Sequence, residues 1–295
     1  MSFALVFAGG GGKGAYEVGV WKALRESGIE DIFASVIGTS VGALNALLFG
    51  QQSLDTAIRI WGEISHRKIL VSNIGGQGAM ANQAGLKNLL QANLTGNLKK
   101  YVYVCCSRVE ADKNFFENLI EEGAFATSGS YQEKSFLGLN LKERIYPEYI
   151  KLNNLSKQKQ IEFLLASAAL PAVYDPVYID GKKYRDGGII AEHNIPYQKA
   201  IELGYRKVLA VSLENGISGI RTFQNGQIYI LCPSESLGEM LDGTVDFDSQ
   251  NAVWRMNLGY ADFMRHKNDI LSFFKQDTIS SKMPNDIKAK LKRMV

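Results

Sequence analysis

The feature that most constrains the fold is a short apolar run that leads directly into four consecutive glycines. The run Ala4–Ala8 predicts a buried strand, and Ala15–Ser27 predicts an amphipathic helix because its apolar residues recur at helical spacing. The glycines between them allow the backbone to turn sharply from strand to helix. A strand that enters a helix in this way is the first half of a β-α-β unit, whose strands are parallel. The chain is therefore predicted to belong to the α/β class.

The same alternation continues through the first two-thirds of the chain. We expect further strands at 34–37, 101–107, 207–213 and 227–232, and further helices at 41–48, 54–64 and 156–169, the last capped by Ser156. This order predicts a three-layer α/β/α architecture with a mostly parallel central sheet. Right-handed crossovers place the carboxyl ends of the parallel strands, and hence the site, along one edge.

Composition and charge exclude several classes of protein. The 295 residues are 46% hydrophobic and 21% charged, which is typical of a globular chain rather than a disordered one. The 33 basic and 30 acidic residues leave a net charge of +3, too small to indicate nucleic-acid binding. The three cysteines lack metal-ligand spacing, so we expect no metal and no other cofactor. The apolar N-terminus has no basic n-region and is too short to span a bilayer, so we expect a cytoplasmic protein.

The glycine loop presents backbone N–H groups to negative charge, and three anion-binding interpretations compete. A P-loop is excluded, because Phe7 stands where its first glycine belongs and Gly14 replaces the hydroxyl that holds magnesium. The dinucleotide fingerprint matches Gly9, Gly11 and Gly14, but the next expected strand ends without the carboxylate that holds a ribose. A nucleotide-binding module using Gly9–Gly14 is therefore kept as an alternative. The third interpretation is an oxyanion hole, which requires a nucleophile nearby.

The next expected strand supplies that nucleophile. It is followed by Gly38-Thr39-Ser40-Val41-Gly42, which fits the nucleophile-elbow pattern G-x-S-x-G. In an elbow, a sharp strand-to-helix turn holds the serine exposed in a strained conformation, and the flanking glycines relieve the crowding. Ser40 is therefore the predicted nucleophile. The simpler alternative is that Ser40 only caps the following helix.

A serine nucleophile needs a base to accept its proton. The segment 180–188 reads as a hairpin in which Asp186 leads into Gly187 and Gly188, although Asp-Gly is first of all a turn signal. None of the three histidines lies in a motif, but His193 is near this segment. A Ser–His–Asp esterase or thioesterase with His193 as base and Asp186 orienting it therefore stays open.

Taken together, these residues resemble the patatin-like phospholipases, a branch of the lipid acyl hydrolases. The resemblance rests on three blocks in the right order, Gly9–Gly14, Gly38–Gly42 and Asp186–Gly188. It extends to Ala166–Pro171, Asn194–Pro196 and, more loosely, Leu258–Asp262, and so spans residues 4 to about 265. It implies the patatin-like α/β fold.

The resemblance also implies a mechanism and roles for individual residues. Ser40 would be the nucleophile and Asp186 the base of a Ser–Asp dyad, and Gly10, Gly11 and Gly12 would donate N–H groups to the oxyanion. Gly9, Lys13, Gly14, Gly38, Gly42, Gly187 and Gly188 match supporting positions of the motifs. One departure is Gly12, where the family usually carries a small residue such as alanine. The implied activity is that of a phospholipase A or lysophospholipase-like esterase, which cleaves lipid esters through an acyl-enzyme without a cofactor.

The chain is expected to form one hydrolase domain, residues 1–281, with two additions. The aromatic-rich segment 113–154 is interpreted as an insertion or lid over the site, and equally as core. The tail 282–295 is basic and amphipathic, which favours contact with a lipid surface, although a packed terminal helix gives the same pattern. We therefore expect a cytoplasmic protein that can be peripheral at a membrane. The sequence assigns neither an oligomeric state nor a regulatory partner.

Overall fold

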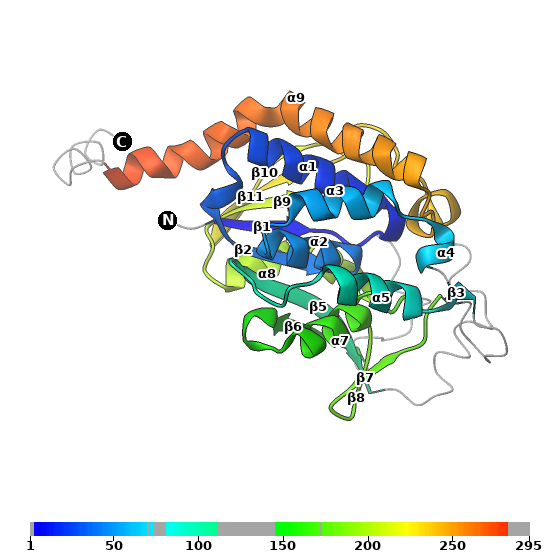
Figure 1. Ribbon diagram of the computed structural model, residues 1–295. Helices are drawn as coiled ribbons and strands as arrows, with labels where there is room; N and C mark the ends of the chain where they lie inside the picture. Colours follow the sequence, from blue (N-terminus) through cyan, green and yellow to red (C-terminus); the bar gives the residue numbers. More distant parts are fainter. Residues whose placement is uncertain (1–2, 70, 73–80, 111–144, 172, 283–295) are drawn as a thin grey trace, which may run out of the picture.

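The computed structural model describes residues 3–69, 71–72, 81–110, 145–171 and 173–282 (Figure 1). Its strands are β1 (Phe3–Phe7), β2 (Phe33–Thr39), β5 (Tyr101–Val109), β6 (Ile145–Lys151), β7 (Val177–Ile179), β8 (Lys182–Asp186), β9 (Lys207–Val211), β10 (Gly219–Phe223) and β11 (Gly226–Leu231), and a separate pair, β3 (Val71–Ser72) and β4 (Ala81–Asn82). Its helices are α1 (Ala15–Glu26), α2 (Val41–Gly50), α3 (Leu54–Gly62), α4 (His66–Ile69), α5 (Ala84–Asn93), α7 (Lys157–Ser167), α8 (Tyr197–Glu202) and α9 (Ser249–Lys282).

The main sheet has the strand order β10-β11-β9-β1-β2-β5-β8-β7, and β6 pairs with the free side of β5. The five central strands, β11, β9, β1, β2 and β5, are parallel, whereas β10, β6, β8 and β7 join antiparallel. The predicted α/β fold with a mostly parallel central sheet flanked by helices is confirmed. Strands β6 and β10 were not predicted. Both join the sheet antiparallel, and a β-α-β pattern in the sequence predicts only parallel strands.

Strand β5 determines which chain ends meet at the carboxyl edge of the sheet. Its first half pairs with β2, where Thr39 lies opposite Cys105. Its second half pairs on the same side with β8, where Asp186 lies opposite Cys106. Because β2 and β8 run in opposite directions along one neighbour, their carboxyl ends meet at consecutive positions of β5. The residue that follows Thr39 is thereby brought next to Asp186.

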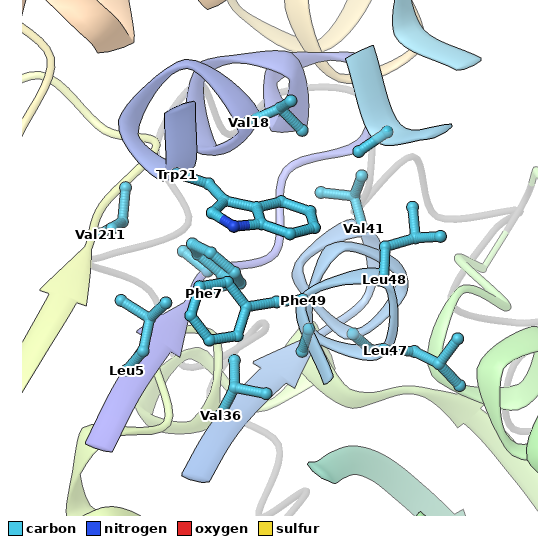
Figure 2. Packing of buried hydrophobic residues seen from close by; sticks show 14 of the residues in the cluster. Leu5, Phe7, Val18, Trp21, Val36, Val41, Leu47, Leu48, Phe49 and Val211 are labelled. Atoms are coloured by element: carbon cyan, nitrogen blue, oxygen red, sulfur yellow. The ribbon is translucent and has the colours of Figure 1, made fainter. Parts of the chain in front are cut away.

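The two faces of the sheet are covered differently. On one face, the odd-numbered side chains of β1 pack with α1, α2 and α9, and Figure 2 shows Phe7 beside Trp21 and Phe49. Phe49 makes an edge contact with Phe7 at 6.2 Å and a tilted contact with Trp21 at 5.2 Å, measured between ring centroids. On the other face, the even-numbered side chains Ala4 and Val6 pack against α8. Helices therefore cover both faces of the sheet.

Helix α9 lies on the same face as α1 and was not predicted from the sequence. It packs along α1, beside which it runs in Figure 1. Gly259 of α9 lies against the backbone of Tyr16, and Gly19 of α1 lies against the backbone of Met256, with no room for a β-carbon at either glycine. Within the described part of the chain, no helix is both long and apolar enough to cross a membrane.

Two predicted additions fall largely outside the described residues. Of the expected insertion or lid, residues 113–144 lie outside them, and the remainder forms β6 and a 3₁₀ turn at Leu152–Asn154. Of the expected basic tail, residues 283–295 lie outside them, and Lys282 is the last residue of α9. The roles of both segments stay predictions.

Candidate active site

Ser40 occupies a strained turn between β2 and α2. Its backbone has φ 54° and ψ −123°, a conformation that non-glycine residues rarely adopt. The flanking glycines are required here, because a β-carbon on Gly38 would overlap the Gly42 carbonyl and one on Gly42 would overlap the carbonyls of Phe7 and Ala8. The side chain of Ser40 makes no capping hydrogen bond to α2. The geometry is that of the predicted nucleophile elbow rather than of a helix cap.

The strained Ser40 backbone is held by Ser167, the last residue of α7. The Ser40 N–H donates to Ser167 Oγ at 2.9 Å, and Ser167 Oγ donates to the Cys105 carbonyl of β5 at 2.6 Å. Ser167 is fully buried and therefore has no water to compete for these bonds. Its role was not predicted, although it lies in the Ala166–Pro171 block that carries the family resemblance.

Asp186 contacts Ser40 directly. Ser40 Oγ donates to Asp186 Oδ2 at 2.6 Å, a short distance typical of a hydroxyl bound to a carboxylate. The other oxygen, Oδ1, accepts the Gly188 N–H at 2.7 Å and so caps the 3₁₀ turn Gly187–Ile189. A β-carbon on Gly187 would overlap the Cys105 carbonyl, so a glycine is needed for the turn to approach β5. Asp186 thus serves both as the turn carboxylate and as the partner of the serine.

Burial sets the acidity of this carboxyl group. Asp186 is 3% exposed, and the loss of hydration raises its pKa from about 4 to about 7. The hydrogen bonds from Ser40 and the Gly188 N–H act in the opposite direction by stabilising the charged form. The result is a carboxylate that is more basic than usual and is aimed at a serine hydroxyl.

The glycine loop lies across the same site. A β-carbon on Gly9 would lie 3.2 Å from Ser40 Cβ, and one on Gly14 would lie 2.5 Å from a methyl group of Val41, so the loop rests on the start of α2. Gly11 has φ 55°, which favours glycine, and begins the 3₁₀ turn Gly11–Gly14. Gly9 and Gly14 therefore lie beside the elbow, and Gly9, Gly10 and Gly11 line the cavity at Ser40.

Asn194 joins the loop to the Asp186 segment and was not predicted as a site residue. Its side-chain Nδ2 donates to the Gly9 carbonyl at 3.2 Å, and its own carbonyl accepts the Gly9 N–H at 3.0 Å. A β-carbon on Gly188 would lie 2.7 Å from Asn194 Oδ1, so the absence of a side chain at Gly188 leaves room for the Asn194 amide. Because a peptide unit is planar, fixing the Gly9 carbonyl also fixes the N–H of Gly10.

Lys13 is paired with an acidic side chain that lines the cavity at Ser40. It is 5% exposed, and its ammonium pairs with Glu214 Oε1 at 3.1 Å. Glu214 follows β9 and lines the cavity at the site. The pair ties the loop to the carboxyl end of β9 and neutralises the buried lysine.

The histidine alternative is not favoured by the geometry. The His193 ring shares a 2.8 Å hydrogen bond between Nδ1 and the Tyr149 hydroxyl, while its carbonyl accepts from Thr39 Oγ1 at 2.7 Å. His66 and His266 are bonded to the Phe247 N–H and the Tyr229 hydroxyl. No histidine is among the described residues that line the cavity at Ser40.

A cavity opens at Ser40 and is mostly apolar. Its empty volume is about 1120 Å³, including open solvent at the mouth. Besides Ser40, Asp186 and Gly9–Gly11, its lining includes leucine, isoleucine and tryptophan side chains of α2, α3 and α5, namely Leu44, Leu48, Ile60, Trp61, Leu86, Leu89 and Leu90. Among the residues that the structure describes, no group of three or more His, Cys, Asp or Glu side chains could hold a metal ion.

Comparison with known proteins finds a matching family model and a similar fold. A family model described as patatin-like phospholipase matches residues 5–201, which include the loop, the elbow and Asp186. Among solved structures, VipD from Legionella pneumophila matches with a TM-score of 0.50 and 11% sequence identity over 90% of this chain. The match covers 66% of the VipD chain, slightly less than two thirds, and at this identity it supports the fold alone. No curated protein sequence matches the chain.

The raised pKa of Asp186 predicts a stability effect that does not depend on catalysis. Because the folded pKa lies above the unfolded one, the stability that this group contributes is present below about pH 4 and is lost as the pH rises through 7. A pKa difference of about three units corresponds to at most about 4 kcal/mol in the free energy of unfolding. Asp186→Asn should therefore gain stability relative to the parent between pH 4 and pH 8, measured by urea unfolding across that range. A difference that stays constant with pH would contradict the buried, raised-pKa carboxyl.

Proposed function

The chain belongs to the patatin-like phospholipase family, and on that premise we propose that it is a lipid acyl hydrolase in which Asp186 activates Ser40 directly. The observation that carries the proposal is the 2.6 Å hydrogen bond between Ser40 Oγ and a carboxylate that is almost completely buried. A nucleophile bonded to its base is the arrangement that covalent hydrolysis requires.

The proposed reaction follows from the atoms in contact. Asp186 Oδ2 takes the proton of Ser40 as the serine oxygen attacks the ester carbonyl. The N–H groups of Gly10, Gly11 and Gly12 stabilise the resulting oxyanion. Asp186 then returns the proton to the leaving alcohol, and an acyl-enzyme remains on Ser40. Water, activated in the same way by Asp186, releases the fatty acid.

The pKa of the base suits this role. An ordinary carboxylate with a pKa near 4 is a poor acceptor for a serine proton, and a base is most effective when its pKa lies near the working pH. Burial brings the pKa of Asp186 to about 7. The strained elbow and the buried base thus support a dyad that needs no imidazole.

The cavity supports a long acyl chain as the group bound next to the serine. Leu44 and Leu48 lie one and two turns beyond Ser40 along α2, which at 1.5 Å per residue places them about 6 Å and about 12 Å along the helix axis. The walls are aliphatic side chains that gain from contact with a hydrocarbon chain. A lipid ester, presented at a lipid surface, is therefore the proposed substrate class.

The nucleotide-binding alternative receives less support from the same geometry. In a dinucleotide site, the glycine loop leaves room for a pyrophosphate at the start of the following helix. Here the first glycine lies against the β-carbon of Ser40, and the adjoining cavity is walled by leucine and isoleucine. The loop is better suited to an oxyanion formed at the serine.

Three variants separate a dyad from a triad. Ser40→Ala and Asp186→Asn should each lower hydrolysis of a soluble ester by at least about 10³-fold, because each removes a group that acts in bond formation. His193→Ala should keep most of the activity, because its ring is bonded to Tyr149. The measurement is kcat/KM on p-nitrophenyl butyrate with folded protein verified by circular dichroism. A His193→Ala variant as inactive as Ser40→Ala would favour the Ser–His–Asp alternative.

Two substitutions along α2 test whether the acyl chain lies in the part of the cavity lined by this helix, which we call the acyl groove. Leu48→Trp should lower activity on a palmitate ester about tenfold or more while sparing acetate and octanoate esters, because the ring would fill the far part of the groove. Leu44→Trp, one turn closer to Ser40, should lower activity on octanoate as well and spare only acetate. The chain-length profile of each variant is compared with that of the parent. Equal losses on all three esters would show that the acyl chain does not lie along α2.

A further inference from the structure

The oxyanion donors depend on the backbone that lies behind them. Gly11 and Gly12 press so closely on the carbonyls of Thr244 and Asp246 that a β-carbon on either glycine would overlap them. This contact explains why Gly12 stands where the family usually has alanine. The supporting segment, Met240–Asp248, begins with one turn of π-helix, Met240–Thr244, and continues to the start of α9. It lies outside the residues matched by the family model.

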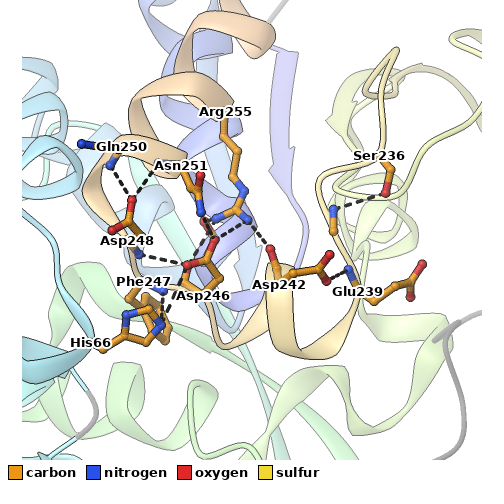
Figure 3. Close-up of polar contacts among 12 residues, drawn as sticks. His66, Ser236, Glu239, Asp242, Asp246, Phe247, Asp248, Gln250, Asn251 and Arg255 are labelled. Atoms are coloured by element: carbon orange, nitrogen blue, oxygen red, sulfur yellow. Dashed lines mark hydrogen bonds and ion pairs between the residues drawn. The ribbon is translucent and has the colours of Figure 1, made fainter.

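One side chain of α9, Arg255, holds this segment and the loop together, and Figure 3 shows its bonds to Asp242 and Asp246. Arg255 is 2% exposed. Its Nη2 donates to the Asp242 carbonyl at 2.7 Å and pairs with Asp246 Oδ2 at 2.8 Å, and its Nη1 donates to the Asp246 carbonyl at 3.2 Å. The same Nη1 donates to the Gly12 carbonyl of the loop at 3.3 Å. The Asp246 carboxylate also accepts a hydrogen bond from Asn251 Nδ2 at 2.9 Å, so both members of the Arg255–Asp246 ion pair have further hydrogen bonds that fix them.

The orientation of the guanidinium is passed on through planar peptide units. The peptide whose carbonyl is Gly12 also carries the Lys13 N–H, which donates to the Gly10 carbonyl at 3.2 Å. The Gly10 carbonyl in turn shares its peptide plane with the Gly11 N–H. Because the carbonyl and the N–H of one peptide unit point in opposite directions, fixing the Gly10 carbonyl aims the Gly11 N–H.

We propose that Arg255 is a positioning residue for catalysis: through Gly12 and Lys13 it aims the Gly11 N–H at the oxyanion. The proposal rests on the hydrolase function proposed above. Asn194 aims the Gly10 N–H from the other side of the loop in the same manner, so two donors are each fixed by a side chain distant in sequence. A lysine cannot replace the arginine, because an ammonium group lacks the planar fork that reaches several acceptors at once.

The test compares Arg255→Lys with Arg265→Lys. Arg265 is an exposed residue of the same helix and pairs with the buried Asp262 at 2.8 Å, so its variant controls for a general effect on α9. Active-site titration with a fluorophosphonate gives the fraction of reactive Ser40. We expect kcat per titrated site to fall about 10- to 100-fold in Arg255→Lys, with KM within about twofold of the parent. A misaimed donor stabilises the transition state less but leaves the binding of the substrate unchanged. Arg265→Lys should match the parent.

Two inhibitors separate positioning from structure. A long-chain trifluoromethyl ketone forms an oxyanion on Ser40, so its inhibition constant should rise in Arg255→Lys by the same factor by which kcat falls. The corresponding fatty alcohol fills the groove without an oxyanion, and its inhibition constant should not change. A parent-like kcat per titrated site, or equal weakening of both inhibitors, would overturn the proposal.

A second variant keeps the proposal testable if Arg255→Lys does not fold. Asp246→Asn keeps the size of the side chain and removes the charge that orients the guanidinium, so a smaller fall in kcat at constant KM is expected. An unchanged kcat would overturn the proposal. Ser40→Ala distinguishes the two levels of the account, because full activity in that variant would reject the hydrolase itself, whereas an inactive Ser40→Ala with a parent-like Arg255→Lys would reject only the positioning role.

Discussion

The site depends on one constraint, which is that β5 pairs with two strands in succession along the same side. The end of β2 lies opposite Cys105 and the end of β8 opposite Cys106, so adjacent positions of β5 bring together Ser40, which follows β2, and Asp186, which ends β8. The Cys105 carbonyl, at this junction, accepts from Ser167, which in turn holds the Ser40 N–H. A change in the register of β8 by one residue would turn Asp186 to the opposite face of the sheet.

The elbow and the buried carboxylate both raise the free energy of the folded chain. A non-glycine residue at positive φ costs about 1 to 3 kcal/mol, and ionising Asp186 in its buried position adds a penalty above pH 7. The surrounding contacts offset these costs, since Ser40 is bonded on its backbone and on its side chain and Asp186 on both oxygens. These hydrogen bonds hold the strained turn at Ser40 and the buried carboxyl group of Asp186 in place.

The sequence predicted the parts of the site that local chemistry dictates. The elbow at Ser40 and the glycine loop are tight turns that require glycine at particular spacings. Such turns can therefore be recognised from a short segment of sequence. The supporting residues Ser167, Asn194 and Arg255 carry no such signal, because each acts through contacts more than a hundred residues away in the chain. The antiparallel strands β6 and β10 were missed for a different reason, because a strand that joins the edge of the sheet leaves no β-α-β alternation.

In the proposed reaction a buried carboxylate, and not an imidazole, removes the proton of Ser40. The most direct test is the pH dependence of kcat/KM for a soluble ester, which reports the ionisation of the free enzyme. A buried carboxylate base predicts one rising limb with a midpoint at about pH 7, where Asp186 loses its proton, and the same midpoint in His193→Ala. A midpoint near pH 4, as for an exposed carboxylate, or a midpoint near 7 that disappears in His193→Ala, would contradict it.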